Sequence, residues 1–241
     1  MRKVLLAAGT FVVLSASVAS ATGLNLSWND CGLAGTQTNT FACNTSTGLP
    51  FTLVASYIPP PNIELVGLSS QLDIRADAPT LPDWWAHSAT GCRGTTGINT
   101  NFDFTGGPFT CTDYWLGQAA GGFAYDVGFG TPDRARMRIQ CAIPFGTQSA
   151  VDPSLEYYAY KVNILRSKTT GTGSCAGCTN SACIVLNEIQ LFQDPLRAND
   201  PIINNPIDRN YVTWQSPSVL GCPASTPNHS SSWGQVKSLY R

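Results

Sequence analysis

The feature that most limits the fold is a strict alternation of residue types over 133–145. Its apolar members share one face and are Ala135, Met137, Ile139, Cys141 and Ile143. Its polar members share the opposite face and are Arg134, Arg136, Arg138 and Gln140. Because successive side chains of a β-strand point to opposite faces, this run predicts a strand that is buried on one side.

Similar short runs, bounded by Gly, Pro, Asn and Ser, recur along the chain and predict further strands. They cover 24–28, 50–58, 63–75, 101–104, 112–116, 123–127, 155–165, 182–192 and 211–214. We expect 133–145 and 155–165 to form a long antiparallel hairpin, with 182–192 in the same sheet. Helix is predicted only at 81–87 and 232–241. Frequent short strands with little helix predict an all-β sandwich of roughly nine to twelve strands, for example a jelly roll.

The first 21 residues have the layout of a cleavable secretion signal. Met1-Arg2-Lys3 is basic, 4–18 is mostly apolar, and Ala19-Ser20-Ala21 is a small-x-small cleavage pattern. A membrane anchor would need about 20 consecutive apolar residues, so we expect cleavage and no transmembrane anchor in the mature chain. We assign 22–197 to the sandwich, and 198–241 to a strap with a short terminal helix packed on the same domain.

Charge gives no reason to expect nucleic acid as a partner. The chain has 14 Lys and Arg against 15 Asp and Glu, a formal net charge of −1, and only 12% of its residues are charged. Nucleic-acid-binding domains carry a clustered basic excess, which is missing here. A polar, weakly charged composition is instead common on secreted β-proteins.

Nine cysteines, all beyond the signal segment, indicate an oxidising compartment and several disulfides. Proximity in the sequence favours Cys31–Cys43 and Cys92–Cys111. Two further bridges are expected among four residues, Cys175, Cys178, Cys183 and Cys222, which allow three pairings. Because nine is odd, one thiol stays unpaired, and Cys141 is the candidate because it lies on the apolar face of its strand.

The spacing Cys175-x-x-Cys178 also occurs in zinc sites and in dithiol redox motifs. A zinc site needs a second ligand pair, and a redox motif normally opens a helix, whereas this motif lies in a Gly- and Thr-rich loop before a strand. We therefore favour structural disulfides and expect neither a metal nor a cofactor.

No catalytic constellation stands out, and we assign no catalytic residue. The chain has two histidines, His87 and His229, and no G-x-S-x-G elbow. Glycoside hydrolysis needs two carboxylates flanking a sugar. Five carboxylates are candidates by residue type alone: Asp103, Asp113, Asp126, Glu156 and Glu188. Most aspartates stand beside Gly, Thr or Pro, where Asp normally stabilises turns.

Two groups of side chains are candidates for binding. Aromatic rings near Gly-rich loops can stack on sugars, and these are Trp84, Trp85, Tyr114 and Trp115. The alternative is that they pack in the core. A basic stripe on 133–145 and its expected hairpin partner can dock an acidic polymer, and it consists of Arg134, Arg136, Arg138 and Lys161. The alternative is a solvated sheet face.

Three segments carry a resemblance to uncharacterised secreted bacterial proteins. They are Leu81-Pro82-Asp83-Trp84-Trp85, the Cys175 to Asn187 region, and Trp233-Gly-Gln-Val-Lys-Ser-Leu-Tyr-Arg241. The resemblance implies bacterial export and a β-sandwich, and no activity. The stretch Glu64 to Ile74 also resembles the early strands of cohesin-type sandwiches.

Together these features predict a secreted or cell-surface, non-enzymatic protein that binds or assembles with something outside the cell. An extracellular polysaccharide or a surface protein is the expected partner. The alternatives are a carbohydrate-binding module and an extracellular glycoside hydrolase. A further alternative is that the tail, 233–241, docks to an export or anchoring partner.

Overall fold

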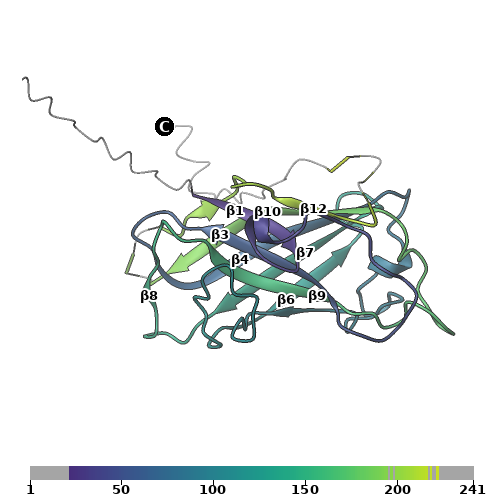
Figure 1. The fold of residues 1–241 in the computed structure, drawn as a ribbon, viewed down its shortest axis with the longest axis horizontal. Helices are drawn as coiled ribbons and strands as arrows, with labels where there is room; N and C mark the ends of the chain where they lie inside the picture. Colours follow the sequence, from purple (N-terminus) through teal and green to yellow (C-terminus); the bar gives the residue numbers. More distant parts are fainter. Residues whose placement is uncertain (1–21, 195, 198, 217, 219–220, 223–241) are drawn as a thin grey trace, which may run out of the picture.

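Two β-sheets face each other in the computed structural model, which describes residues 22–194, 196–197, 199–216, 218 and 221–222 (Figure 1). The smaller sheet has the strand order β1, β3, β9, β5. These strands are β1 (Gly23–Trp28), β3 (Phe51–Ile58), β9 (Tyr157–Ile164) and β5 (Ile98–Asn101). Every neighbouring pair in this sheet is antiparallel.

The larger sheet has the order β2, β12, β10, β4, β7, β6. These strands are β2 (Thr38–Asn39), β12 (Tyr211–Trp214), β10 (Ala182–Gln193), β4 (Glu64–Ala76), β7 (Arg134–Ala142) and β6 (Ala120–Val127). Two short strands add to it, β11 (Ile202–Ile203) on β10 and β8 (Ser149–Ala150) on β4. The all-β, two-sheet architecture confirms the predicted fold class.

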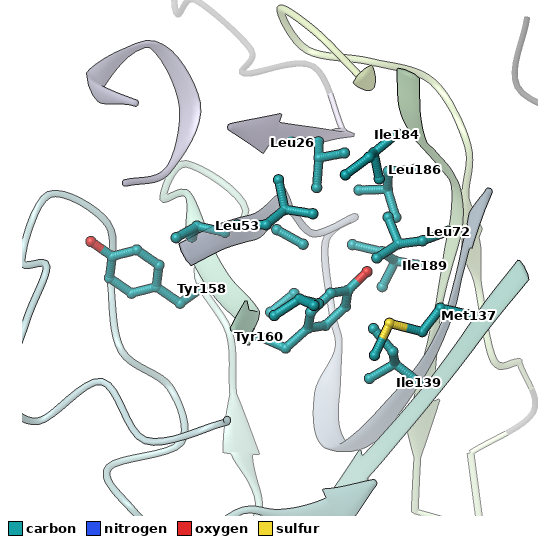
Figure 2. Packing of buried hydrophobic residues seen from close by; sticks show 14 of the residues in the cluster. Leu26, Leu53, Leu72, Met137, Ile139, Tyr158, Tyr160, Ile184, Leu186 and Ile189 are labelled. Atoms are coloured by element: carbon teal, nitrogen blue, oxygen red, sulfur yellow. The ribbon is translucent and has the colours of Figure 1, made fainter. Parts of the chain in front are cut away.

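The core lies between the sheets because each strand turns its apolar face inward. Figure 2 shows Leu26 and Leu53 of the smaller sheet facing Leu72 and Ile184 of the larger one. Tyr160 also points across the gap. Its hydroxyl lies 2.7 Å from Ser70 Oγ, which itself donates to the Glu188 carbonyl at 2.9 Å. A buried hydroxyl thus has a partner, as burial requires.

Five aromatic rings surround Trp214 of β12 where the two sheets meet at one edge. Their centroids lie 4.5 to 6.0 Å from the Trp214 ring, and they belong to Trp28, Phe41, Phe51, Trp84 and Trp85. Two of the four indole N–H groups of this cluster have backbone acceptors, since Trp28 Nε1 donates to Thr213 O at 3.0 Å and Trp214 Nε1 to Cys178 O at 2.7 Å. This Trp214 cluster packs the smaller sheet against the larger one.

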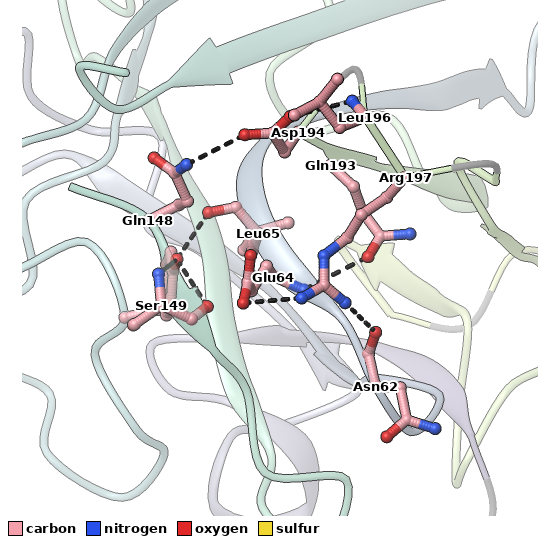
Figure 3. A network of polar contacts seen from close by, with 10 residues as sticks. Asn62, Glu64, Leu65, Gln148, Ser149, Gln193, Asp194, Leu196 and Arg197 are labelled. Atoms are coloured by element: carbon pink, nitrogen blue, oxygen red, sulfur yellow. Dashed lines mark hydrogen bonds and ion pairs between the residues drawn. The ribbon is translucent and has the colours of Figure 1, made fainter. Parts of the chain in front are cut away.

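The strap that follows β10 covers the free edge of β1. Leu24 N donates to Asn205 O at 2.9 Å, and Leu26 N donates to Arg209 O at 3.0 Å. Arg197, at the start of the strap, pairs with Glu64 at 2.6 Å and donates to Asn62 O at 3.2 Å (Figure 3). The backbone groups along the outer edge of β1 are therefore hydrogen-bonded to the strap. Covering an edge in this way commonly protects a sheet against unwanted strand addition.

The predicted hairpin of 133–145 with 155–165 is wrong. β7 pairs with β4 and β6 in the larger sheet, whereas β9 pairs with β3 and β5 in the smaller one. The alternation correctly predicts a strand in both places, although the first four residues of β9 are all buried. It says nothing of the neighbouring strand, however, and the link between β7 and β9 crosses from one sheet to the other. The expectation that 182–192 shares a sheet with 133–145 is correct.

Most of the predicted disulfide pairings are wrong. Cys31 pairs with Cys111, Cys43 with Cys178 and Cys92 with Cys175, so neither Cys31–Cys43 nor Cys92–Cys111 forms. Of the two bridges expected among Cys175, Cys178, Cys183 and Cys222, only Cys183–Cys222 exists. Three of the bridges span 80 or more residues, because the fold brings distant loops together and sequence proximity does not measure that. Cys141 is free and buried, as predicted.

The remaining local predictions have mixed outcomes. The helix expected at 81–87 is a single 3-10 turn, η2 (Asp83–Trp85), and a second such turn is η1 (Gly32–Ala34). The strand expected at 101–104 lies earlier, as β5, and 112–116 forms no strand apart from one bridge at Thr112. The signal segment 1–21 and the terminal helix 232–241 lie outside the described residues.

Replacing Trp214 with Ala should lower the free energy of unfolding by about 3–5 kcal/mol, because the substitution leaves a cavity among five rings. Chemical denaturation monitored by circular dichroism measures this loss. Phe109→Ala is the matched control, since that ring is 78% exposed, and it should change stability by less than about 0.5 kcal/mol. Equal effects of the two substitutions would contradict the assigned joint.

Cys141 should be inert in the folded protein. Burial raises the pKa of its thiol to about 12, so almost no reactive thiolate exists at pH 8. Without reductant, iodoacetamide should label no cysteine in the native protein and one, Cys141, after unfolding in guanidinium chloride, as counted by mass spectrometry. The Cys141→Ala variant should take up no label in either state. Rapid labelling of the native protein would show that the assigned burial is incorrect.

Candidate functional site

A groove of about 770 Å³ lies over β6 and β7, beside the end of β10. We call it the β6 groove. Its small lining residues are Ala120, Gly121, Gly122, Ala124 and Ala142, and its larger ones are Leu68, Phe123, Arg138, Gln140, Cys141 and Phe192. Exposed Arg138, Gln140 and Ala142 alternate along β7 with buried Ile139 and Cys141. The groove therefore opens on the side of the larger sheet that points away from the core.

The hollow exists because β6 carries almost no side-chain bulk at its first residues. A Cβ atom added to Gly122 would meet no heavy atom within 4 Å, so the space above this residue is open. Gly121 serves a different purpose. A Cβ there would lie 2.1 Å from the Gln140 carbonyl oxygen, so only glycine allows β6 to approach β7 this closely.

Polar and aromatic groups border this open floor. Arg138 donates from Nη2 to Asp126 Oδ2 at 2.8 Å, with side-chain exposures of 57% and 44%. Such an exposed pair adds at most about 1 kcal/mol to stability, so the guanidinium can rearrange toward a ligand. Gln140 is exposed beside it, and the half-buried ring of Phe192 supplies apolar surface, whereas Phe123 lies opposite Ile139 and packs against the core. The site thus combines hydrogen-bonding groups with aromatic surface and little net charge.

The predicted aromatic platform is not a surface feature. The rings of Trp84, Trp85 and Trp115 are fully buried, and Tyr114 is half-buried with its hydroxyl donating to Leu65 O at 2.5 Å. Trp84 and Trp85 belong to the Trp214 cluster, and Trp115 Nε1 donates to the Ala159 carbonyl at 2.9 Å. The interpretation as a sugar-stacking platform is therefore wrong, and the alternative of core packing is correct.

The predicted basic stripe is divided. Lys161 lies on β9 in the other sheet, where its Nζ stands 4.6 Å from the Phe104 ring centroid. Arg136 is buried against Asp73, with two hydrogen bonds of 2.6 and 2.7 Å. Arg134 is half-buried, and Arg138 is the exposed member. A continuous cationic surface does not form, because β4 and β6 place Asp73 and Asp126 opposite these arginines.

The five carboxylates considered for hydrolysis lie apart from the groove lining. Asp103 accepts from Thr105 N at 2.9 Å and Asp113 from Trp115 N at 3.0 Å, which are turn-stabilising contacts. Glu156 accepts from Ser56 Oγ at 2.6 Å and from Asn25 Nδ2 at 2.9 Å. Glu188 accepts from Gln71, and Asp126 pairs with Arg138 at the groove's border.

Sequence reasoning identified Arg138 but missed the rest of the groove. The available signal was the run Ala120-Gly121-Gly122-Phe123-Ala124, which is a strand without bulk. The absence of side chains at these positions gives no motif that a sequence analysis can recognise. Phe192 is distant in sequence and reaches the site because β10 pairs with β4.

Neither the remaining features of the described residues nor similarity to known proteins assigns a function. No helix among the described residues is long and apolar enough to cross a bilayer. Within the same residues, no group of three or more His, Cys, Asp or Glu side chains is placed to hold a metal ion. No protein-family model matches the chain, and neither a curated protein nor a solved structure was found to match it.

Proposed function

We propose that this chain is an exported, non-enzymatic protein that holds an extended saccharide polymer in the β6 groove. The observation that carries the proposal is the groove itself, with its side-chain-free floor at Gly122, its Phe192 ring, and its donors Arg138 and Gln140.

Export is supported by two features of the chain. The first 21 residues have the charge, apolar stretch and cleavage pattern of a secretion signal. Eight of the nine cysteines are joined in four disulfides, which persist in oxidising compartments outside the cytoplasm. Secreted or cell-surface placement is therefore part of the proposal.

A saccharide fits the groove better than a strongly charged ligand does. Arg138 already has a carboxylate partner, so the groove offers no surplus of positive charge to an acidic polymer. Amide and guanidinium N–H groups can donate to sugar hydroxyls, while phenyl rings cover the apolar faces of sugar rings. The lining includes no carboxylate, and we therefore do not assign glycoside hydrolysis to it.

A second candidate is assembly by strand addition, and the position of β6 favours it. β6 is the last strand of the larger sheet, and five of its eight residues are exposed. Its sequence, AGGFAYDV, contains no Pro or Lys and one charged residue, so it has few of the features that normally protect an edge. An extended segment of a surface protein can add to such an edge through backbone hydrogen bonds.

Replacing Gly122 with Leu should separate these candidates. The new side chain fills the groove without backbone strain, and binding to polysaccharides retained by the wild-type protein should weaken at least about tenfold. A glycan array identifies the polymer, and affinity electrophoresis measures the change. Gly106→Leu is the matched control, because Gly106 is another open glycine without positive φ and lies outside the groove.

Two results would contradict saccharide binding in the groove. One is a wild-type protein that retains no polymer on a broad array. The other is Gly122→Leu binding as tightly as Gly106→Leu. Binding to an extended peptide that survives Gly122→Leu would support strand addition, because that mode uses the backbone of β6 and not the groove floor.

A further inference from the structure

The last strand of the larger sheet, β6, carries a row of backbone groups that point away from its neighbour β7. Directly after β6, Gly128 N donates to Arg134 O at 2.7 Å. Hydrogen-bonded and non-hydrogen-bonded pairs alternate along an antiparallel ladder, so the even-numbered residues of β6 exchange backbone bonds with β7. The odd-numbered residues direct their N–H and C=O groups outward, and they are Gly121, Phe123, Tyr125 and Val127.

This outward edge of β6 is open to a further strand. In the described part of the chain, no strand except β7 pairs with β6, and no loop backbone bonds to its four outward residues. Gly121 is exposed near one end of the edge, and Val127 is 45% exposed at the other. The residues of β6, all of them described, include none with a positive φ, so the edge is regular extended backbone. Such an edge pairs readily with another strand.

A second copy of β6 complements this edge in one antiparallel register. When Ala124 faces Ala124 of the second copy, Gly121 lies opposite Val127 of that copy and Phe123 lies opposite its Tyr125. These are all outward residues, so each pair exchanges both of its N–H···O bonds. A two-fold axis repeats the pairs on the other half of the strand, and no outward group is left over. Sliding one strand by two residues would leave an outward residue unpaired in each copy.

The side chains of β6 suit this register on both faces of the sheet. On the outer face, the residue at the axis is the exposed Ala124, whose methyl group is small enough for the close approach of a non-hydrogen-bonded pair. On the inner face, Phe123 stands beside Tyr125 of the second copy, and aromatic cross-strand pairs stabilise a sheet. Val127 stands beside Gly121, which has no side chain to obstruct it.

The charges of the two copies are also compatible. Asp126 is the one charged residue of β6, so the pairing brings no like charges opposite each other. In this register Asp126 stands beside Gly122 of the second copy, whose neighbour on β7 is Gln140. Two strand spacings, about 10 Å between Cα atoms, separate Gln140 from that carboxylate, which is within the combined reach of the two side chains. The open position at Gly122 leaves the way between them free.

We propose that the β6 edge is a homodimer interface, at which two copies of this chain pair β6 with β6 about a two-fold axis at Ala124. The inference rests on the strand-addition candidate, names its partner, and does not depend on saccharide binding. The dimer joins the two larger sheets into one and sets the two β6 grooves side by side. One pair of short strands buries less than the roughly 1,200 Å² of a standard interface, so the dimer is weak and the protein is monomeric at low micromolar concentration.

Sedimentation equilibrium of residues 22–241, with no ligand added, measures the dimer directly. The wild-type protein should be a monomer at about 1 µM and mostly a dimer at about 1 mM. Ala124→Lys places two like charges opposite each other at the axis, so it should weaken the dimer at least about fivefold. Ala124→Glu should have the same effect. Because Ala124 is exposed, Tm at 1 µM should stay unchanged in both variants.

Mixing the two variants tests the register. An equimolar mixture of Ala124→Lys and Ala124→Glu puts opposite charges face to face, so it should dimerise at least as tightly as the wild-type protein. Ala150→Lys is the matched control, because Ala150 is an exposed alanine on another strand, β8, and its dimer should be unchanged.

Three results would overturn the proposal. The first is a wild-type protein that is monomeric at 1 mM, and if that monomer binds an extended peptide, strand addition stands without the dimer. The second is Ala124→Lys dimerising as tightly as Ala150→Lys. The third is a mixture of Ala124→Lys and Ala124→Glu that dimerises no better than either variant alone. A glycan array result does not enter this test, so the dimer and saccharide binding can fail separately.

Discussion

The packing of five aromatic rings around Trp214 is the interaction on which the rest of the structure depends. Trp214 belongs to the larger sheet, whereas Trp28 and Phe51 belong to the smaller one, so the cluster fixes how the sheets meet. The Cys43–Cys178 bridge lies beside it, and Gln215 joins the two partner loops by donating to Phe41 O and Cys178 O, each at 2.9 Å. Large rings and sulfur together make this edge of the sandwich rigid.

The Trp214 cluster closes one edge of the larger sheet. The accessible edge of that sheet is therefore the opposite one. The strap pairs with β1, but among the described residues β7 is the only strand hydrogen-bonded to β6. The residues of β6 that would shield its surface are Ala and Gly, so a groove remains there. The molecule therefore has a tryptophan-rich edge that stabilises the sandwich. At β6 it has an accessible strand with few bulky side chains.

The sequence was sufficient for the longer strands and insufficient for their arrangement. Alternation in 63–75 and 133–145 identified β4 and β7, because a period of two is a local property. The partners of β7 and of β9 depend on contacts distant in sequence, and so do the pairs Cys31–Cys111 and Cys43–Cys178. Trp84 and Trp85 beside Gly-rich loops looked like a binding platform, since local sequence does not reveal what covers a ring. The β6 groove had no signal of this kind, because it consists of missing side chains.

The central claim is that ligand binds on the β6 side while the Trp214 cluster stays closed, and hydrogen–deuterium exchange measured by mass spectrometry tests it most directly. In the free protein, peptides covering 120–127 should exchange faster than those covering 64–76 and 211–214. A bound polymer should slow exchange in 120–127 and 134–142 and leave 211–214 unchanged. Slow exchange of β6 in the free protein, or ligand protection confined to the segment around Trp84 and Trp85, would contradict the account.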